Sequence, residues 1–214
     1  MELLHWIAAA ATIAALVAYL LYLALAPHNL AWHTHATLRA DWFDAVSTQP
    51  GTEILAVQTL RNSVMTATMT ASTSALGLMG AATLVERHLH PALAADAAAW
   101  LFTPRVAMEL TAMALLLLAL VASIMAIRYY NHAGFVCAMP VGSIARQRWA
   151  NMGKNHLRRA GVLYSWGLRC MILVAPVLVS IVYAPSGPVA AVVVTGLLYG
   201  LERVSPPDST MQEA

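Results

Sequence analysis

The sequence predicts an all-α fold, a polytopic bundle of transmembrane helices, and three observations lead to that prediction. The chain has 214 residues, of which 60% are hydrophobic and only 10% are charged, whereas a soluble domain carries about 25% charged residues. Several apolar stretches reach the roughly 20 residues that a helix needs to cross a bilayer. Basic residues gather beside alternate stretches, as the positive-inside rule describes for repeated crossings. The net charge of +2 is too small to indicate nucleic-acid binding.

We expect a single membrane domain over residues 1–201, followed by a polar tail over residues 202–214. The five expected spans are residues 3–26, 64–85, 106–127, 162–183 and 189–201. The last has only about 13 residues, which is short for a full crossing, so four spans are the alternative. The first lacks a positive leading region and is longer than the core of a signal peptide, so we expect it to be retained. Residues 86–105 are expected to form a loop.

The second span belongs to a longer helix with an unusual composition. A Gln-Pro-Gly turn at 49–51 precedes Thr52 and Glu53, which indicate a helix start. The helix can continue to about Val85, a length of about 50 Å, so its first turns are expected outside the roughly 30 Å hydrocarbon core. Small residues at four-residue spacing predict close packing on another helix. They are Ser63, Ala67, Ala71 and Ala75.

Two polar and aromatic segments, residues 28–51 and 140–160, are expected to lie on the membrane surface, because aromatic and apolar residues alternate with charges in both. The most basic loop spans residues 128–161. Placing it in the cytoplasm leaves only Arg87 and Arg105, of the 12 Lys and Arg residues, on the other side. This bias predicts an N-terminus outside and a C-terminus inside, in a multi-pass protein of a bacterial inner membrane.

Two polar segments at the expected membrane boundaries carry a resemblance to a known family. They are Ile54–Met65 (ILAVQTLRNSVM) and Ile127–Phe135 (IRYYNHAGF), and the likeness continues through Gly167-Leu168-Arg169. The chain resembles the membrane family catalogued as domain of unknown function 599, which occurs in bacteria and plants. The resemblance implies a multi-span membrane protein and supplies no activity, substrate or cofactor. The histidine-rich segment at residues 28–35 does not match the family pattern.

Polar residues in these two segments form the main candidate site. Six residues lie where the second span begins and the third ends: Gln58, Arg61, Asn62, Arg128, Asn131 and His132. By the expected topology both groups lie at the cytoplasmic end. There they form a mouth for an anion, a lipid headgroup or a partner loop, since arginine binds phosphate and carboxylate at two points. The alternative is that each arginine caps a helix or reaches the lipid phosphates.

Two further features of the sequence are candidate functional sites. His28, His33 and His35 are candidates for a metal site, because imidazole is a common metal ligand. Their spacing does not place all three on one helix face, and solvated histidines at the interface are the alternative. Glu109 is an acid inside an expected span, where a carboxylate must pair or become protonated. Arg105, four residues earlier, offers it an ion pair near the outer boundary.

The sequence contains no Walker loop, no metalloprotease or nucleophile-elbow motif and no paired carboxylates. It therefore does not indicate an enzyme, and any cofactor is unknown. We expect first an accessory or structural subunit that packs into a larger membrane assembly, with membrane lipids and either another membrane protein or a second copy as partners. The alternatives are a small transporter, channel or lipid- or anion-binding protein that uses the polar mouth, and a metal- or redox-associated component that uses the N-terminal histidines.

Overall fold

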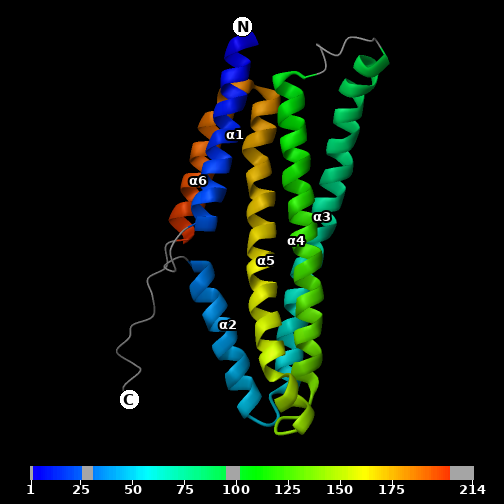
Figure 1. Ribbon diagram of the computed structural model, residues 1–214, viewed down its shortest axis with the longest axis vertical. Helices are drawn as coiled ribbons and strands as arrows, with labels where there is room; N and C mark the ends of the chain where they lie inside the picture. Colours follow the sequence, from blue (N-terminus) through cyan, green and yellow to red (C-terminus); the bar gives the residue numbers. More distant parts are fainter. Residues whose placement is uncertain (1, 26–30, 95–101, 203–214) are drawn as a thin grey trace.

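The computed structural model describes residues 2–25, 31–94 and 102–202 and, within them, consists of helices joined by short turns (Figure 1). The elements in chain order are α1 (Glu2–Leu25), α2 (Ala31–Thr48), α3 (Glu53–Ala94), α4 (Pro104–Ala138), α5 (Ile144–Val182), the 3-10 turn η2 (Ala184–Ser186) and α6 (Gly187–Glu202). The all-helical fold class is therefore confirmed.

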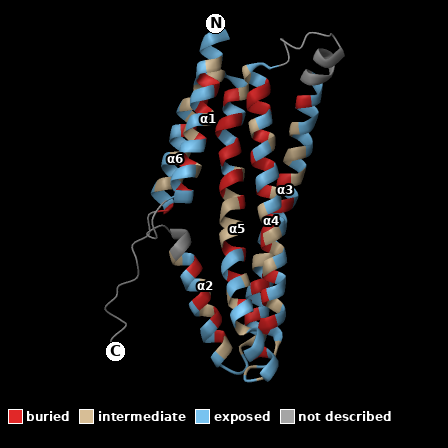
Figure 2. Cartoon of the chain, viewed as in Figure 1, coloured by how far each residue is buried: buried red, intermediate tan, exposed pale blue. Residues whose placement is uncertain are grey.

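Three long antiparallel helices, α3, α4 and α5, run the length of the molecule, while α1 and α6 flank one half and α2 flanks the other (Figure 1). Each half has its own hydrophobic core. Leu16, Met108 and Leu173 are buried in the half with α1 and α6. Phe43 and Leu157 are buried in the half with α2. Buried positions follow the inner faces of α4 and α5 through both halves (Figure 2). We call the half with α1 and α6 the apolar half, and the half with α2 the basic half.

Among the described residues, four segments are long and apolar enough to cross a membrane. They are α1, α4, α5 and Ala184–Glu202, which consists of η2 and α6 together. The last reaches 19 residues, so it is longer than the stretch expected at residues 189–201. Of the described helices, α3 has ample length but is not among the four, because Thr, Ser, Gln and Asn lower its hydropathy. Of the five expected spans, residues 64–85 are thus helical but differ in composition from the rest.

Helix boundaries differ from those expected, because hydropathy marks where a chain is apolar and not where a helix ends. α5 contains residues 144–160, expected to form part of a separate surface segment, in one helix with residues 162–182. Pro176 lies inside α5 without ending it. At 39 residues, α5 is about 58 Å long, so one end must project beyond a hydrocarbon core of about 30 Å. Likewise α4 continues past Ile127 to Ala138.

Other expected boundaries shift in the same way. α3 begins at Glu53 as predicted but continues to Ala94, so it includes residues that were expected to belong to a loop. The expected surface segment at residues 28–51 contains α2. Thr103 caps α4, since its Oγ1 accepts a hydrogen bond from the N–H of Val106 at 3.3 Å.

The small-residue row of α3 packs against α4, which confirms close helix packing. Ala67 and Ala71 are buried there together with the hydroxyls of Thr70 and Ser74. These side chains are short enough to let the two backbones approach closely. Further along, Gly77 lies against Leu116, whose Cδ2 would be 3.1 Å from an added Cβ. The small side chains of α3 are thus used within the chain itself.

Glu53 ties the start of α3 to the turn between α4 and α5. Its Oε1 accepts a hydrogen bond from the N–H of Val141 at 3.0 Å. This hydrogen bond favours the ionised form and lowers the pKa of the Glu53 carboxyl below its ordinary value. Its stabilisation is therefore fully present above the unfolded pKa of about 4.5 and is lost as the pH falls through the lowered pKa of the folded state.

Glu53→Gln is expected to lower the thermal midpoint by a small amount at neutral pH, because an amide accepts the Val141 hydrogen bond more weakly than a carboxylate does. The difference from the wild type should disappear once the pH is below the folded pKa of Glu53. Thermal unfolding measured from pH 7 down to about pH 3 checks this. The control is Glu86→Gln, at an exposed position of the same helix. A Glu53→Gln deficit that is constant with pH would contradict it.

Candidate functional site

The six residues of the predicted polar mouth lie at one level of the basic half but do not converge. Gln58, Arg61 and Asn62 are exposed on α3, and Arg128, Asn131 and His132 are exposed on α4. Leu60 and Tyr130, which lie among them in sequence, share one buried cluster, so the two groups are at the same height. Among the described residues, no hydrogen bond or ion pair links one group to the other. The His132 ring instead lies 5.5 Å from that of His156 on α5.

The proposed metal ligands fall largely outside the described part of the chain. His28 lies outside the described residues, and so does the side chain of His33. His35 is exposed on α2. Within residues 2–25, 31–94 and 102–202, no group of three His, Cys, Asp or Glu side chains is placed to hold a metal ion.

The buried acid Glu109 is paired with the arginine one turn before it. Its side chain is 1% exposed, and its Oε1 accepts a hydrogen bond from Nε of Arg105 at 3.1 Å. The Arg105 side chain is 56% exposed, so the pair reaches from the helix interior to the surface. Charge pairing offsets the cost of burying the carboxylate, as the four-residue spacing indicated.

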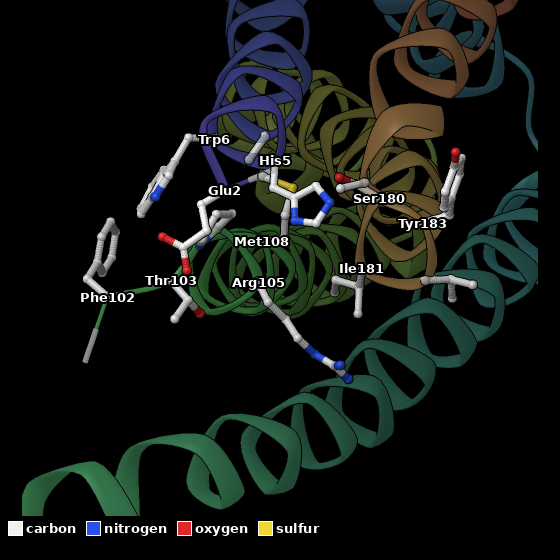
Figure 3. A pocket seen from close by; sticks show the side chains of 14 residues that line it. Glu2, His5, Trp6, Phe102, Thr103, Arg105, Met108, Ser180, Ile181 and Tyr183 are labelled. Carbon is white, nitrogen blue, oxygen red and sulfur yellow. The ribbon is translucent and has the colours of Figure 1, made fainter. Parts of the chain in front are cut away.

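A cavity of about 710 Å³ opens beside this ion pair, where α1 and α4 begin and α5 ends (Figure 3). One wall is aromatic: the rings of Trp6 and Phe102 stack with centroids 5.6 Å apart. Met108 and Ile181 add apolar surface. The cavity has the size of small-molecule sites, about 300–1,000 Å³, and their mixture of an apolar lining with a few polar groups.

The polar groups of the cavity are Glu2, His5, Thr103, Arg105, Ser180 and Tyr183. Ser180 is 4% exposed, and its Oγ has no hydrogen-bond partner. A buried hydroxyl without a partner costs about 1–3 kcal/mol. The sequence indicated none of this, because Glu2, Arg105 and Ser180 come from three helices that only the fold brings together.

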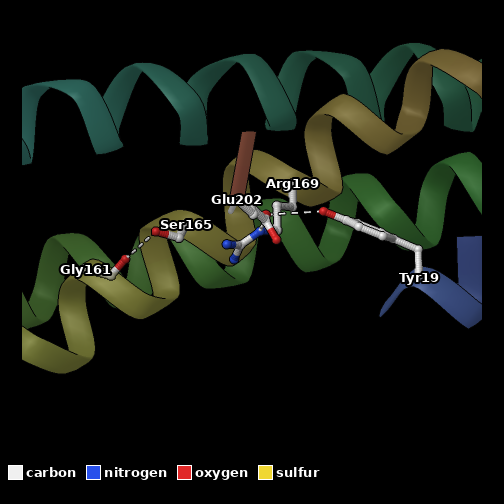
Figure 4. Close-up of polar contacts among 5 residues, drawn as sticks. All are labelled: Tyr19, Gly161, Ser165, Arg169 and Glu202. Atoms are coloured by element: carbon white, nitrogen blue, oxygen red, sulfur yellow. Dashed lines mark hydrogen bonds and ion pairs between the residues drawn. The ribbon is translucent and has the colours of Figure 1, made fainter. Parts of the chain in front are cut away.

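A second polar cluster is buried at the other end of α1 and α6 (Figure 4). Arg169 on α5 donates from Nε to Oε1 of Glu202, the last residue of α6. Tyr19 on α1 donates to the same oxygen at 3.2 Å. The Arg169 and Glu202 side chains are only 9% and 10% exposed. The cluster therefore joins α1, α5 and α6. The signal in the sequence is an arginine within an apolar stretch, and its partner lies 33 residues away.

A third buried group, Arg146, joins the ends of three helices in the basic half. It is 2% exposed. Its Nη1 donates to the carbonyl oxygens of Cys137 at 3.0 Å and Met139 at 2.6 Å, and its Nη2 donates to that of Val46 at 3.2 Å. Carbonyls at helix C-termini lack partners within the helix and carry partial negative charge. One guanidinium thus binds the C-terminal ends of α2 and α4 to the start of α5.

Comparison with known proteins gives a family and no relative of assigned activity. No curated protein and no solved structure matches the chain. The family described as "Protein of unknown function, DUF599" matches residues 7–207. This range includes α2 to α6, the buried Arg169–Glu202 pair and both segments that carried the resemblance. The chain therefore belongs to the DUF599 family, as the polar segments at its membrane boundaries indicated.

Proposed function

We propose that this protein is an accessory or structural subunit of a larger membrane assembly and that it binds a partner helix on the outer face of α3. The observation that carries the proposal is a row of exposed residues whose spacing alternates between four and three. The row, which we call the α3 seam, comprises Met65, Met69, Ser72, Leu76, Met79 and Thr83. A period of 3.5 is the pattern by which one helix packs along another.

The α3 seam lies opposite the face that packs on α4. Ala67, Ala71 and Ser74 are buried on that inner face, about half a helical turn away from the seam at 100° per residue. α3 therefore has two faces with the pattern of helix contacts, and α4 covers one of them. Three of the six seam residues are methionine, whose flexible side chain adapts to varied partner surfaces.

The seam differs from the apolar surface of α4 at the same level. Leu117, Leu118 and Val121 of α4 are exposed and have the composition of a lipid-facing surface. On α3, small residues and threonines surround the methionines. The Thr68 and Thr73 hydroxyls donate to backbone carbonyls four residues earlier, at 2.8 and 2.9 Å. The small residues leave room between the methionines for the backbone of a second helix, which favours another helix over lipid.

Two residues of the predicted polar mouth extend the seam into the basic half. Asn62 lies three residues before Met65, and Gln58 lies four residues before Asn62, so both continue the alternating spacing. An amide at one position of a helix–helix seam fixes register and partner choice at some cost in stability. Gln58 and Asn62 are therefore assigned to recognition of a partner helix. The positive-inside rule favours a cytoplasmic location for this half, in a multi-pass inner-membrane protein.

A photo-crosslinking residue at Met69 is expected to join the chain to a partner in native membranes, whereas the same residue at Leu118 should give only lipid adducts. A product of twice the chain mass identifies a second copy, and any other discrete product identifies a different subunit. Ser72→Trp is expected to abolish the Met69 product, because the indole replaces a small side chain and prevents close approach of the helices. Leu118→Trp is the matched control. Equal labelling at both sites, or a product unchanged by Ser72→Trp, would overturn the proposal.

A further inference from the structure

We propose that the cavity between α1, α4 and α5 binds a small organic ammonium ion, a protonated amine attached to an aromatic or branched apolar group. The cavity lies on a different part of the molecule from the α3 seam, so this inference does not depend on the proposed function. Charge, the aromatic wall and size each support it.

The charges of the lining favour a cation. Arg105 is held by Glu109, whose Oε1 is 3.1 Å from its Nε. Glu2 also lines the cavity, and among the described residues its carboxylate has no ion-pair or hydrogen-bond partner. Glu2 is therefore the lining carboxylate without a counter-charge in the described part of the chain. A bound ammonium group would supply this counter-charge to Glu2 through a charge-assisted hydrogen bond, which is about twice as strong as a neutral one.

The aromatic wall adds a second cation-binding element. Glu2 projects between the Trp6–Phe102 pair and His5 (Figure 3). An ammonium group beside this carboxylate would therefore also lie near the ring of Trp6. Trp is the aromatic residue that attracts cations most strongly, and the attraction increases when the cation is desolvated. The same rings exclude water from the apolar part of a ligand.

The hydroxyl of Ser180 is not a ligand of this site. Ser180 lines the cavity from α5, but its Oγ is fully buried and lies beside Gly187 and the hydroxyl of Thr12. The polar contact to the ligand is therefore assigned to Glu2. A quaternary ammonium cannot donate a hydrogen bond to the Glu2 carboxylate, so the site is expected to prefer an amine that carries hydrogen. Met108 and Ile181 face the apolar part of the ligand.

The test uses three probes of similar shape and different charge: 2-phenylethylammonium, 2-phenylethanol and 3-phenylpropionate. Binding to the full chain in nanodiscs of zwitterionic lipid is measured by calorimetry, with empty nanodiscs as the reference for partitioning. We expect saturable binding of one ammonium ion per chain. The alcohol should bind at least about tenfold more weakly, because one charge-assisted hydrogen bond is worth about 1.5–3 kcal/mol. The carboxylate should show no saturable binding.

Glu2→Gln is expected to weaken ammonium binding about tenfold or more and to leave 2-phenylethanol binding unchanged. Glu86→Gln, at an exposed position of α3 outside the cavity, is the control and should have no effect. Glu2 lies on the exposed first turn of α1, so its variant is expected to fold. Equal affinity for the three probes, tighter binding of the carboxylate, or an unchanged affinity in Glu2→Gln would overturn the proposal.

Discussion

Replacing Arg146 with methionine is expected to lower the free energy of unfolding by about 3–5 kcal/mol. The guanidinium binds three backbone carbonyls, two beside the end of α4 and one near the end of α2. Methionine fills a similar volume but leaves these buried acceptors without a donor, and each unpaired acceptor costs about 1–3 kcal/mol. Chemical unfolding in detergent micelles, followed by tryptophan fluorescence, measures the loss.

Arg146→Lys is expected to recover less than half of that loss. A single ammonium group has no planar fork, and it cannot reach the Val46 and Cys137 carbonyls as two separate nitrogens do. Arg148→Met is the matched control, because Arg148 is exposed two residues away, and such a surface change is expected to stay within about 0.5 kcal/mol. If Arg146→Met and Arg148→Met destabilised the protein equally, Arg146 would not join the three helices.

Glu202→Ala is expected to destabilise the protein by about 3–5 kcal/mol, because it leaves the charge of Arg169 buried without its partner. The same change removes the acceptor of the Tyr19 hydroxyl. The end of α6 should then separate from α1 and α5. We expect faster proteolysis near the C-terminus together with the lower unfolding free energy.

The double variant Arg169→Met/Glu202→Met separates the cost of an orphaned charge from the value of the pair. It is expected to recover most of the stability, since apolar residues often replace a buried ion pair at little cost. The comparison is Asp44→Asn, which removes the pairing of Asp44 with Lys154 across α2 and α5, where the side chains are 55% and 36% exposed. Its effect should be at most about 1 kcal/mol. A double variant as unstable as Glu202→Ala would contradict this account.

Local patterns in the sequence were enough for much of the fold. The turn at residues 49–51 and Thr52 mark the start of α3 at Glu53. The spacing of Ala67 and Ala71 indicated a helix-packing face, which α4 covers. The Ile54–Met65 and Ile127–Phe135 segments indicated the family. Each of these depends on residues close together in the chain, where backbone preference and periodicity act.

Helix ends could not be located from hydropathy. Residues 144–160 are polar, yet they continue without a break into the apolar part of α5. A helix satisfies its own backbone hydrogen bonds in water and in lipid alike, so a change of solvent does not require a change of structure. Residues 144–160 therefore form one helix with the next span and are not a separate segment.

The sequence by itself determined the helical class, the family and the faces of individual helices, because these follow from residues a few positions apart. Only the tertiary structure decided which charges are buried. Arg146 meets Val46 across 100 residues, and Arg169 meets Glu202 across 33. The burial of a charge depends on the distant partner that compensates it. That partner cannot be identified from the spacing of residues close together in the sequence. Likewise, only the fold shows that α4 covers one face of α3 and leaves the seam on the opposite face exposed.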